Sequence, residues 1–387
     1  MSALFLAVLL AVAAGEPEGG GPVEPPPHAV PAGRFEWIAL PTVDYDADEK
    51  FGIGVSGQLY WIGDSQPYNQ ALTVKAYLTS GGVQRYRVHY DAPRFLDVPV
   101  RLWLTGEYKV DLFAPYYGLG NASSSRPEDY PALSGSRIFQ WTLHSPYARA
   151  GAALPLGRAA YAFAYLSYRW ITVSPYQDSL LAAQRPIGFE GGGELEGTIG
   201  AYLDRRDHEI HPSRGYYLEA SVRGVGPAST GDFAGFNVRT MYFLSPLSWL
   251  TLATRLEADW LSARAPFFEL SGFGGVHAFD GIGGQYTARG LPKDRYIGRL
   301  KAIGTLEART RLLDVTILER TVSFGPAAFV DAGRVWQLDG SDAPGLGVHA
   351  TVGGGLRLWR GSHVARLDFG ISSEGTTGLY AILGHFF

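Results

Sequence analysis

The 387-residue chain contains no cysteine, and this absence excludes several classes of site at once. Disulfide bonds, thiolate zinc sites, cysteine nucleophiles and a lipid-modified cysteine all need a residue that the sequence lacks. A chain without thiols is also compatible with an oxidising compartment such as the periplasm, where a stray thiol is a liability.

The chain also has few charged residues and no excess of positive charge. Lysine and arginine number 33 against 37 aspartate and glutamate residues, so no basic footprint for nucleic acid exists. Charged residues make up 18% of the chain, below the roughly 25% of soluble proteins. The 50 glycines and the 13% of aromatic residues are typical instead of short turns and of the aromatic girdles of membrane barrels.

A helix-length apolar run is missing as well. The longest run, ALFLAVLLAVAA at residues 3–14, is shorter than the roughly 20 residues of a membrane helix. It predicts a signal peptide over residues 1–15, with small residues at its end for cleavage, although its first residues carry no positive charge. The alternative is a short N-terminal helix. The proline- and glycine-rich residues 16–34 that follow predict a flexible segment.

What the rest of the chain does contain is alternation of apolar and polar residues. It is clear in the segments LTVKAYLT, LTLATRLEADWL and RLKAIGTLEARTRLL, which begin at Leu72, Leu250 and Arg299. A soluble sandwich or a lipocalin-like barrel would also alternate, but many segments here exceed the usual soluble strand of about 5–6 residues. Their charged rows also need water or partners, which a wide lumen supplies. Residues 35–387 are therefore predicted to form one all-β domain, a transmembrane antiparallel β-barrel.

Counting the segments gives about sixteen strands, an even number as single-chain bacterial barrels have. Two connections, 112–136 and 262–298, are much longer than the others, and loops of this length are usually functional or mobile. The predicted strands are 37–45, 51–62, 69–80, 83–92, 98–111, 137–154, 159–174, 188–204, 215–225, 233–244, 250–261, 299–312, 322–336, 347–358, 363–372 and 377–387.

Several short sequence patterns in this part of the chain are specific through their order and spacing. The second long connection ends GGQYTARGLPKDRYIGR, the next two strands read TLEARTRL and GPAAFVDAGRVW, and YYGLGN and YLDRRDHEIHPSRGYYLEASVRG come earlier. Over roughly residues 35–387 the sequence resembles the bacterial surface antigen family, the BamA/TamA-type outer-membrane barrel superfamily. The resemblance implies sixteen strands and a long sixth extracellular loop that folds into the lumen. Its tip carries an Arg-Gly-aromatic motif, matched here by Arg289 and Gly290, with Leu291 in the aromatic position.

The resemblance also implies inward acidic partners for this arginine, matched by Glu307 and Asp331. The alternation independently places Glu307 on the polar row of its strand, hence in the lumen. A guanidinium between two carboxylates would form charge-assisted, often bidentate bonds, and Gly290 would allow a sharp turn at the loop tip. We therefore expect a clamp that holds the loop inside the barrel. The alternative is that Arg289 is an ordinary solvated loop residue.

Two further motifs match the family. One is a turn pattern, Asp-x-Arg-Asp followed by proline and glycine, in which the last two residues serve turn formation directly; the matching residues are Asp204, Arg206, Asp207, Pro212 and Gly215. His208 and His211 beside these aspartates could be metal ligands, but a polar turn explains the spacing equally, and no metal or cofactor is predicted. The other is the C-terminal strand, which ends on Phe387 and resembles a barrel-insertion signal, although His385 occupies a position that is usually apolar.

In this family, BamA and TamA carry periplasmic POTRA domains before the barrel. Only about twenty residues separate the predicted signal peptide from the barrel here, which indicates a member that lacks them. The expected function is outer-membrane protein assembly, translocation or lipid handling, in contact with outer-membrane lipids and with periplasmic or outer-membrane partner proteins. The alternative is a passive pore or a scaffold barrel. No Gly-x-Ser-x-Gly elbow occurs and the nine histidines form no recognisable motif, so we expect no enzyme.

Overall fold

The structure is a computed structural model and describes most of the predicted barrel. The predicted signal peptide, all of the predicted flexible segment except Arg34, and the C-terminal Phe387 lie outside the described residues. The described residues are 34–62, 68–95, 98–208, 211–226, 230–276, 279–317, 320–342, 345, 347–360 and 363–383.

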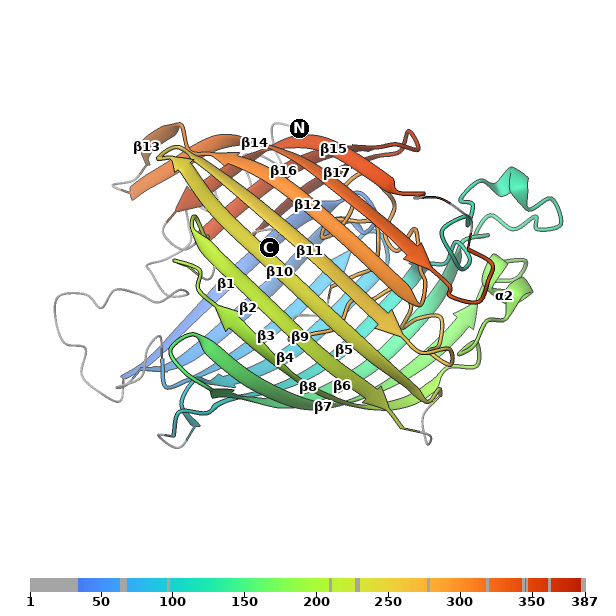
Figure 1. The fold of residues 1–387 in the computed structure, drawn as a ribbon, viewed down its shortest axis with the longest axis horizontal. Helices are drawn as coiled ribbons and strands as arrows, with labels where there is room; N and C mark the ends of the chain where they lie inside the picture. Colours follow the sequence, from blue (N-terminus) through green and yellow to red (C-terminus); the bar gives the residue numbers. More distant parts are fainter. Residues whose placement is uncertain are drawn as a thin grey trace.

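In this part of the chain the strands form one antiparallel sheet that closes on itself (Figure 1). β12 and β13 both pair with β14 and occupy one strand position in the wall. The barrel therefore has the sixteen strand positions that the sequence predicts. The strands are β1 (Arg34–Asp46), β2 (Lys50–Ile62), β3 (Gln70–Thr79), β4 (Val83–Ala92), β5 (Arg101–Pro115), β6 (Gln140–Pro155), β7 (Ala160–Pro175), β8 (Gly192–Asp204), β9 (Gly215–Val225), β10 (Phe233–Leu247), β11 (Leu250–Leu261), β12 (Leu300–Thr310), β13 (Leu313–Ile317), β14 (Arg320–Trp336), β15 (His349–Arg360), β16 (His363–Ser372) and β17 (Thr377–Leu383).

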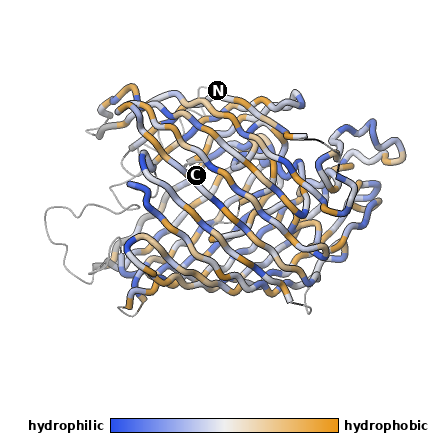
Figure 2. The backbone as a smooth tube through the Cα atoms, in the orientation of Figure 1, coloured by the Kyte–Doolittle hydropathy of each residue, from blue (hydrophilic) through white to orange (hydrophobic). Residues whose placement is uncertain are grey.

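The wall of the barrel has its apolar side chains outside and its charged side chains inside, the reverse of a soluble protein; we call it the inverted wall. Alternate residues of each strand point outward and inward, and Figure 2 shows the resulting mixture of apolar and polar residues along the strands. Large apolar side chains are exposed on the outside, among them Leu166, Ile199 and Leu256. Among the described residues, the five largest fully buried side chains are arginines, namely Arg239, Arg255, Arg289, Arg357 and Arg366. Such a wall suits an apolar surrounding and a polar lumen.

The ring closes between its first and last strands, and few of the described residues pair there. β1 pairs with β2 along all 13 of its residues. Among the described residues it shares with β17 a single residue pair, Tyr45 with Ala381. We call this junction of β1 and β17 the seam.

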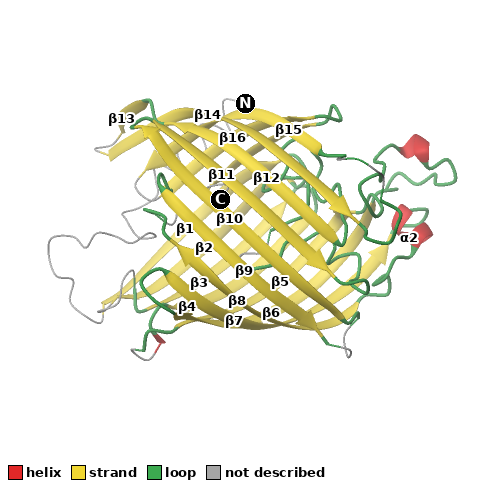
Figure 3. Ribbon diagram, viewed as in Figure 1, coloured by secondary structure: helices red, strands yellow, loops and turns green. Residues whose placement is uncertain are grey.

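The long connections gather at one end of the barrel, which we call the long-loop rim; it lies on the right in Figures 1 and 3. They include the segments between β5 and β6 (116–139), between β7 and β8 (176–191) and between β11 and β12 (262–299). A 3-10 helix, η2 (Pro127–Asp129), and a short α-helix, α2 (Leu180–Gln184), lie in the first two. In the described residues no helix has the length and apolar character needed to span a membrane.

Strand ends in the structure differ from the predicted ends by up to four residues, and two of the differences have a local cause. The predicted start of β8 at residue 188 is wrong, because residues 187–190 form a turn that follows α2. Ser179 caps this helix, Leu180 and Leu181 are buried against Tyr116 and neighbouring side chains, and Gly188 turns the chain with a φ of +88°. The predicted single strand 299–312 is interrupted after Thr310 and continues as β13.

Candidate functional site at the tip of the lumen loop

Residues 262–299, which we call the lumen loop, fold back inside the ring of strands. Ala288, Arg289 and Leu291 near its tip are at most 1% exposed. Leu291, which replaces the aromatic residue implied by the family resemblance, packs in an apolar cluster with Ile282 and Val335. The loop therefore has its own small core inside the lumen, and the leucine fills the apolar position that the motif requires.

Arg289 is held by carboxylates from three different strands. Its Nε and Nη2 atoms each donate to Asp331 of β14 at 3.0 Å, and its main-chain N–H donates to the same carboxylate at 3.1 Å. Its Nη1 atom donates to Glu307 of β12 at 2.7 Å and to Asp368 of β16 at 3.1 Å. The guanidinium also lies over the Phe329 ring, 3.3 Å from its centre. Although burial opposes the charge, these carboxylates hold the pKa of Arg289 above its ordinary value.

Further arginines surround the same carboxylates. Arg357 of β15 bridges two of them, donating to Glu307 at 2.9 Å and to Asp368 at 2.5 Å. Arg309 donates to Glu307 at 2.8 Å, and Arg366 donates to Asp368 at 3.2 Å. All of these side chains are at most 3% exposed. The loop tip is therefore one member of a buried network in which each carboxylate has more than one cationic or polar partner, as buried charges require.

Main-chain contact brings the loop tip against β16 and β17. Gly290 has a φ of +112°, its N–H donates to the Tyr380 hydroxyl at 3.1 Å, and its carbonyl accepts from Thr376 at 2.7 Å. A Cβ atom on Gly370 would lie only 2.1 Å from the Arg289 carbonyl oxygen. Glycine is therefore required at 290 for the backbone conformation and at 370 for the close approach.

A second anchor ties the loop to the other side of the seam. Lys293 donates to Glu49, in the turn between β1 and β2, at 2.7 Å, and Asp280 lies 3.6 Å from the same ammonium group. Burial opposes the charge on Lys293, but the carboxylates of Asp280 and Glu49 outweigh it and raise its pKa well above the ordinary value. Against the same burial, Lys293 and neighbouring cations lower the pKa of Glu49 to about 2. Both partners are therefore charged at neutral pH.

A third anchor joins the loop to other connections at the long-loop rim. Arg295 donates to the Ser123 carbonyl at 2.8 Å, and its Nε lies 3.6 Å from Glu374 in the turn between β16 and β17. Tyr296 donates to Glu374 and stacks on His349 at 3.6 Å. Residues 289–296 thus contact elements on both sides of the seam: β17 and its preceding turn on one side, and the turn after β1 on the other.

The sequence-predicted loop residues lie together in the structure. Arg289, Gly290, Glu307 and Asp331 form the centre of the network. The sequence analysis did not identify Asp368, nor the surrounding arginines 309, 357 and 366. A signal for Asp368 was present, because it alternates with Arg366 on the polar row of the segment HVARLDFGIS.

The predicted turn motif lies at the opposite rim, between β8 and β9. Asp204 accepts three bonds from the Arg206 main chain and side chain at 2.7–3.1 Å, and Asp207 accepts from the Ser213 and Arg214 main-chain N–H groups. Pro212 is buried, and Gly215 has a φ of +103°. These contacts form the turn itself, apart from the lumen network.

The turn's two histidines lie close to each other. The His208 and His211 rings are stacked with their centres 3.6 Å apart. Within the described residues no group of three or more histidine, aspartate or glutamate side chains is arranged to hold a metal ion.

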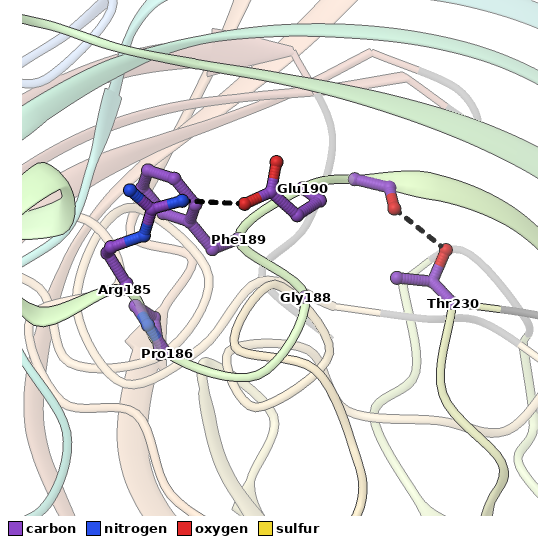
Figure 4. Close-up of a pocket in the computed structure, with 7 residues that line it drawn as sticks. Arg185, Pro186, Gly188, Phe189, Glu190 and Thr230 are labelled. Atoms are coloured by element: carbon purple, nitrogen blue, oxygen red, sulfur yellow. Dashed lines mark hydrogen bonds and ion pairs between the residues drawn. The ribbon is translucent and has the colours of Figure 1, made fainter.

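A shallow hollow of about 340 Å³ on the long-loop rim is a separate feature (Figure 4). Its charged side chains, Arg185 and Glu190, pair with each other at 2.8 Å and are 63% and 81% exposed. Thr230 donates to the Gly191 carbonyl at 3.2 Å. An exposed pair of this kind contributes little energy and presents no buried polar group to a ligand.

Comparison with known proteins matches both the sequence and the fold. The model of the Omp85 superfamily domain matches residues 69–387, whereas no curated protein sequence matches the chain. The structure is similar to that of BamA from Haemophilus ducreyi lacking POTRA domains 1–3, with a TM-score of 0.58 and 13% identity over 91% of this chain and 70% of the other. It is also similar to CdiB from Escherichia coli, with a TM-score of 0.56 and 15% identity over 92% of this chain and 64% of the other. For CdiB from Acinetobacter baumannii the TM-score is 0.52 and the identity is 13%, over 90% of this chain and 59% of the other. The chain thus spans less than two thirds of either CdiB chain, and these likenesses concern the fold.

Proposed function

The chain belongs to the Omp85 superfamily, and on that premise we propose that it acts in the outer membrane of a Gram-negative bacterium in membrane-protein assembly, translocation or lipid handling. The observation that carries this proposal is the seam. In the described part of the two strands one residue pair, Tyr45 with Ala381, joins β1 to β17, whereas β16 pairs with all 7 residues of β17. Unpaired strand edges can template pairing with another strand, so this junction is where a client segment would be received.

The lumen loop supports a route through the seam over a route through the lumen. Its tip is fixed by the Arg289 network on β12, β14 and β16, and by the Lys293–Glu49 ion pair. A loop fixed in this way obstructs the barrel interior, so the resting conductance should be small. The second candidate is a passive pore or a scaffold barrel for partner proteins. The buried ion-pair network around Arg289 would fit this second candidate if it served only to make the barrel rigid.

Placement in the outer membrane is part of the proposal, and the inverted wall supports it. Outward side chains such as Ile199 (62% exposed) and Leu256 (61% exposed) would be costly in water and favourable in lipid. Membrane fractionation tests this directly. The chain should be recovered in the outer-membrane fraction and should migrate differently on a gel before and after heating. Recovery in the soluble fraction without detergent would contradict the placement.

The functional test uses the absence of cysteine from the chain. Tyr45→Cys combined with Ala381→Cys places two thiols at the seam, and directly opposed residues on antiparallel strands lie within the range that a disulfide can bridge. The matched control is Ala201→Cys with Ala220→Cys on the continuously paired strands β8 and β9. Each protein is reconstituted in proteoliposomes, and both ion conductance and the insertion of an unfolded barrel protein are measured.

The two candidates predict different results. If the seam receives clients, the wild-type protein accelerates insertion, oxidation of the seam pair abolishes that acceleration, and reduction restores it. Oxidation of the control pair has no effect. Large steady conductance, with no insertion activity in any form of the protein, would contradict the proposal and support the passive barrel.

A further inference from the structure

The outer wall carries a feature that the seam does not explain. We propose that the outward face of β3, β4 and β5 binds one acyl chain of a membrane lipid, in a hollow whose floor is Gly106. The inference rests on the proposed placement in the outer membrane and is independent of the assembly role.

Strand register gives the hollow its shape. It measures about 340 Å³ and is lined by two neighbouring rows of outward residues and by Lys75, Arg87 and Glu107, which alternate with them. In one row Val74 pairs with Val88, which pairs with Gly106; in the next row Tyr86 pairs with Tyr108. The side chains of these four non-glycine residues are 41–47% exposed. A slot of apolar walls therefore opens outward, with the two tyrosine rings along one edge.

Gly106 supplies the depth of the slot. A Cβ atom added there would have no heavy atom of another residue within 4 Å, so the position is open space in the wall. The alternating residues behind the slot are inward and charged, and Arg87 donates to Glu107 at 2.6 Å. This ion pair joins β4 to β5 directly behind the floor. The missing side chain therefore leaves a hollow in a supported wall, and a larger side chain could fill that hollow without backbone strain.

Polar groups lie directly beyond the tyrosine row, toward the long-loop rim. Tyr108 shares a hydrogen bond of 3.2 Å with His144, and Tyr86 donates to Gln84 at 3.4 Å. Tyrosine rings with polar neighbours are typical of the level where a membrane meets water. An acyl chain in the slot would therefore run from the Gly106 level toward these groups, which are suited to the neutral ester region of a lipid.

The arrangement favours a lipid chain over a peptide strand. β3, β4 and β5 are paired on both sides, so their backbones have no free edge for an added strand. Tyr86, Tyr108 and the valines offer apolar contact, which an acyl chain uses fully because it has no polar backbone of its own.

The experiment compares two leucine substitutions that differ only in position. Gly106→Leu fills the slot. Gly197→Leu is the matched control, because Gly197 is also an outward strand glycine with open space around it. Each protein is reconstituted in phosphatidylcholine vesicles containing a small fraction of phosphatidylcholine with a photoreactive diazirine in its acyl chain. After illumination, the labelled residues are mapped by peptide mass spectrometry, and heat-modifiable migration confirms folding.

In the wild-type protein and in Gly197→Leu, labelling of residues 74–108 should exceed labelling of the β10–β11 wall, whose outward row contains no glycine, several-fold. Gly106→Leu should reduce it to the level of that wall. Uniform labelling around the barrel in the wild-type protein, or enrichment unchanged in Gly106→Leu, would overturn the proposal, because it would show only ordinary surrounding lipid. Crosslinks between two copies at this face would also overturn it. Failure of the seam experiment would leave this result unaffected.

Discussion

Lys293 and Glu49, which are 244 residues apart in the chain, form a buried ion pair of 2.7 Å that joins the lumen loop to the turn between β1 and β2. The same loop contacts Tyr380 on β17 through the main chain of Gly290. The loop therefore bridges the two strands that meet at the seam, where the described residues form one backbone pair. We therefore expect that removing even one of these loop contacts weakens the closure of the barrel at the seam.

Lys293→Met should destabilise the barrel and loosen the loop. Each partner of the Lys293–Glu49 pair is only 9% exposed, so removing the ammonium leaves a buried carboxylate without its main cation, at a cost of about 3–5 kcal/mol. The unfolding temperature in detergent should fall, and the loop should become accessible to protease. Arg185→Ala is the control, because its ion pair with Glu190 is exposed and should contribute almost nothing. Equal effects of the two substitutions would contradict a role for the buried pair.

The same pair predicts how stability depends on pH. The pKa of Glu49 falls from its ordinary 4.5 to about 2 in the folded protein, so the unfolded chain takes up this proton first as pH falls. Its contribution is therefore fully present above pH 4.5 and is lost as pH falls toward 2. Denaturation of the wild-type protein should show this loss, whereas Glu49→Gln should flatten that part of the profile. A profile that is identical in Glu49→Gln would show that the pair contributes nothing.

Gly370→Ala should displace the loop tip although it changes no charge. The added methyl group would meet the Arg289 carbonyl oxygen at 2.1 Å, a distance that cannot be tolerated without movement of β16 or of the loop. Gly354→Ala on β15 is the matched control, since its nearest neighbour would lie 3.4 Å away. We expect a lower unfolding temperature and larger, noisier conductance for Gly370→Ala only. Wild-type conductance in this variant would indicate that the tip contact does not fix the loop.

The sequence was informative about the wall because a barrel strand follows a simple rule. Alternation with period two identifies each strand and the direction of its side chains, so the sixteen strand positions and the inward position of Glu307 could both be predicted. The rule fails where local packing replaces it. The chain turns at Gly188, where the pattern predicted the start of a strand, and β12 ends at Thr310 although the alternation continues into β13.

The partners within the lumen were harder to predict. Which inward residues meet the loop tip depends on how far neighbouring strands are staggered around the ring, and one sequence does not specify that stagger. Glu307 and Asp331 were identified through the family resemblance, whereas Asp368 sits at the same level on β16 and was missed. The contact of Lys293 with Glu49 joins residues that are 244 positions apart, and although Lys293 lies in the quoted loop pattern, nothing in the sequence indicated Glu49 as its partner.

Arg289 is the residue on which the loop position should depend most. Arg289→Ala removes donors to three carboxylates, lowers the unfolding temperature and frees the loop, so the barrel should conduct in larger, noisier steps. Arg289→Lys should rescue only in part, because an ammonium group lacks the planar fork that binds both Asp331 oxygens. Thermal unfolding and single-channel recording measure the two effects. Full rescue by lysine would show that charge alone, without geometry, holds the loop.

A mutant cycle decides whether these residues act as one unit. Glu307→Gln with Asp331→Asn removes two of the carboxylates that hold Arg289, and this double variant should resemble Arg289→Ala in stability and conductance. Adding Arg289→Ala to it should then cost little more, since the bonds that the arginine makes to those carboxylates are already weakened. Asp368 remains in the triple variant with Arg357 and Arg366 as its partners, so no carboxylate there loses all of its cations. Strictly additive losses around the cycle, or wild-type conductance in every variant, would show that the residues are independent and that no clamp exists.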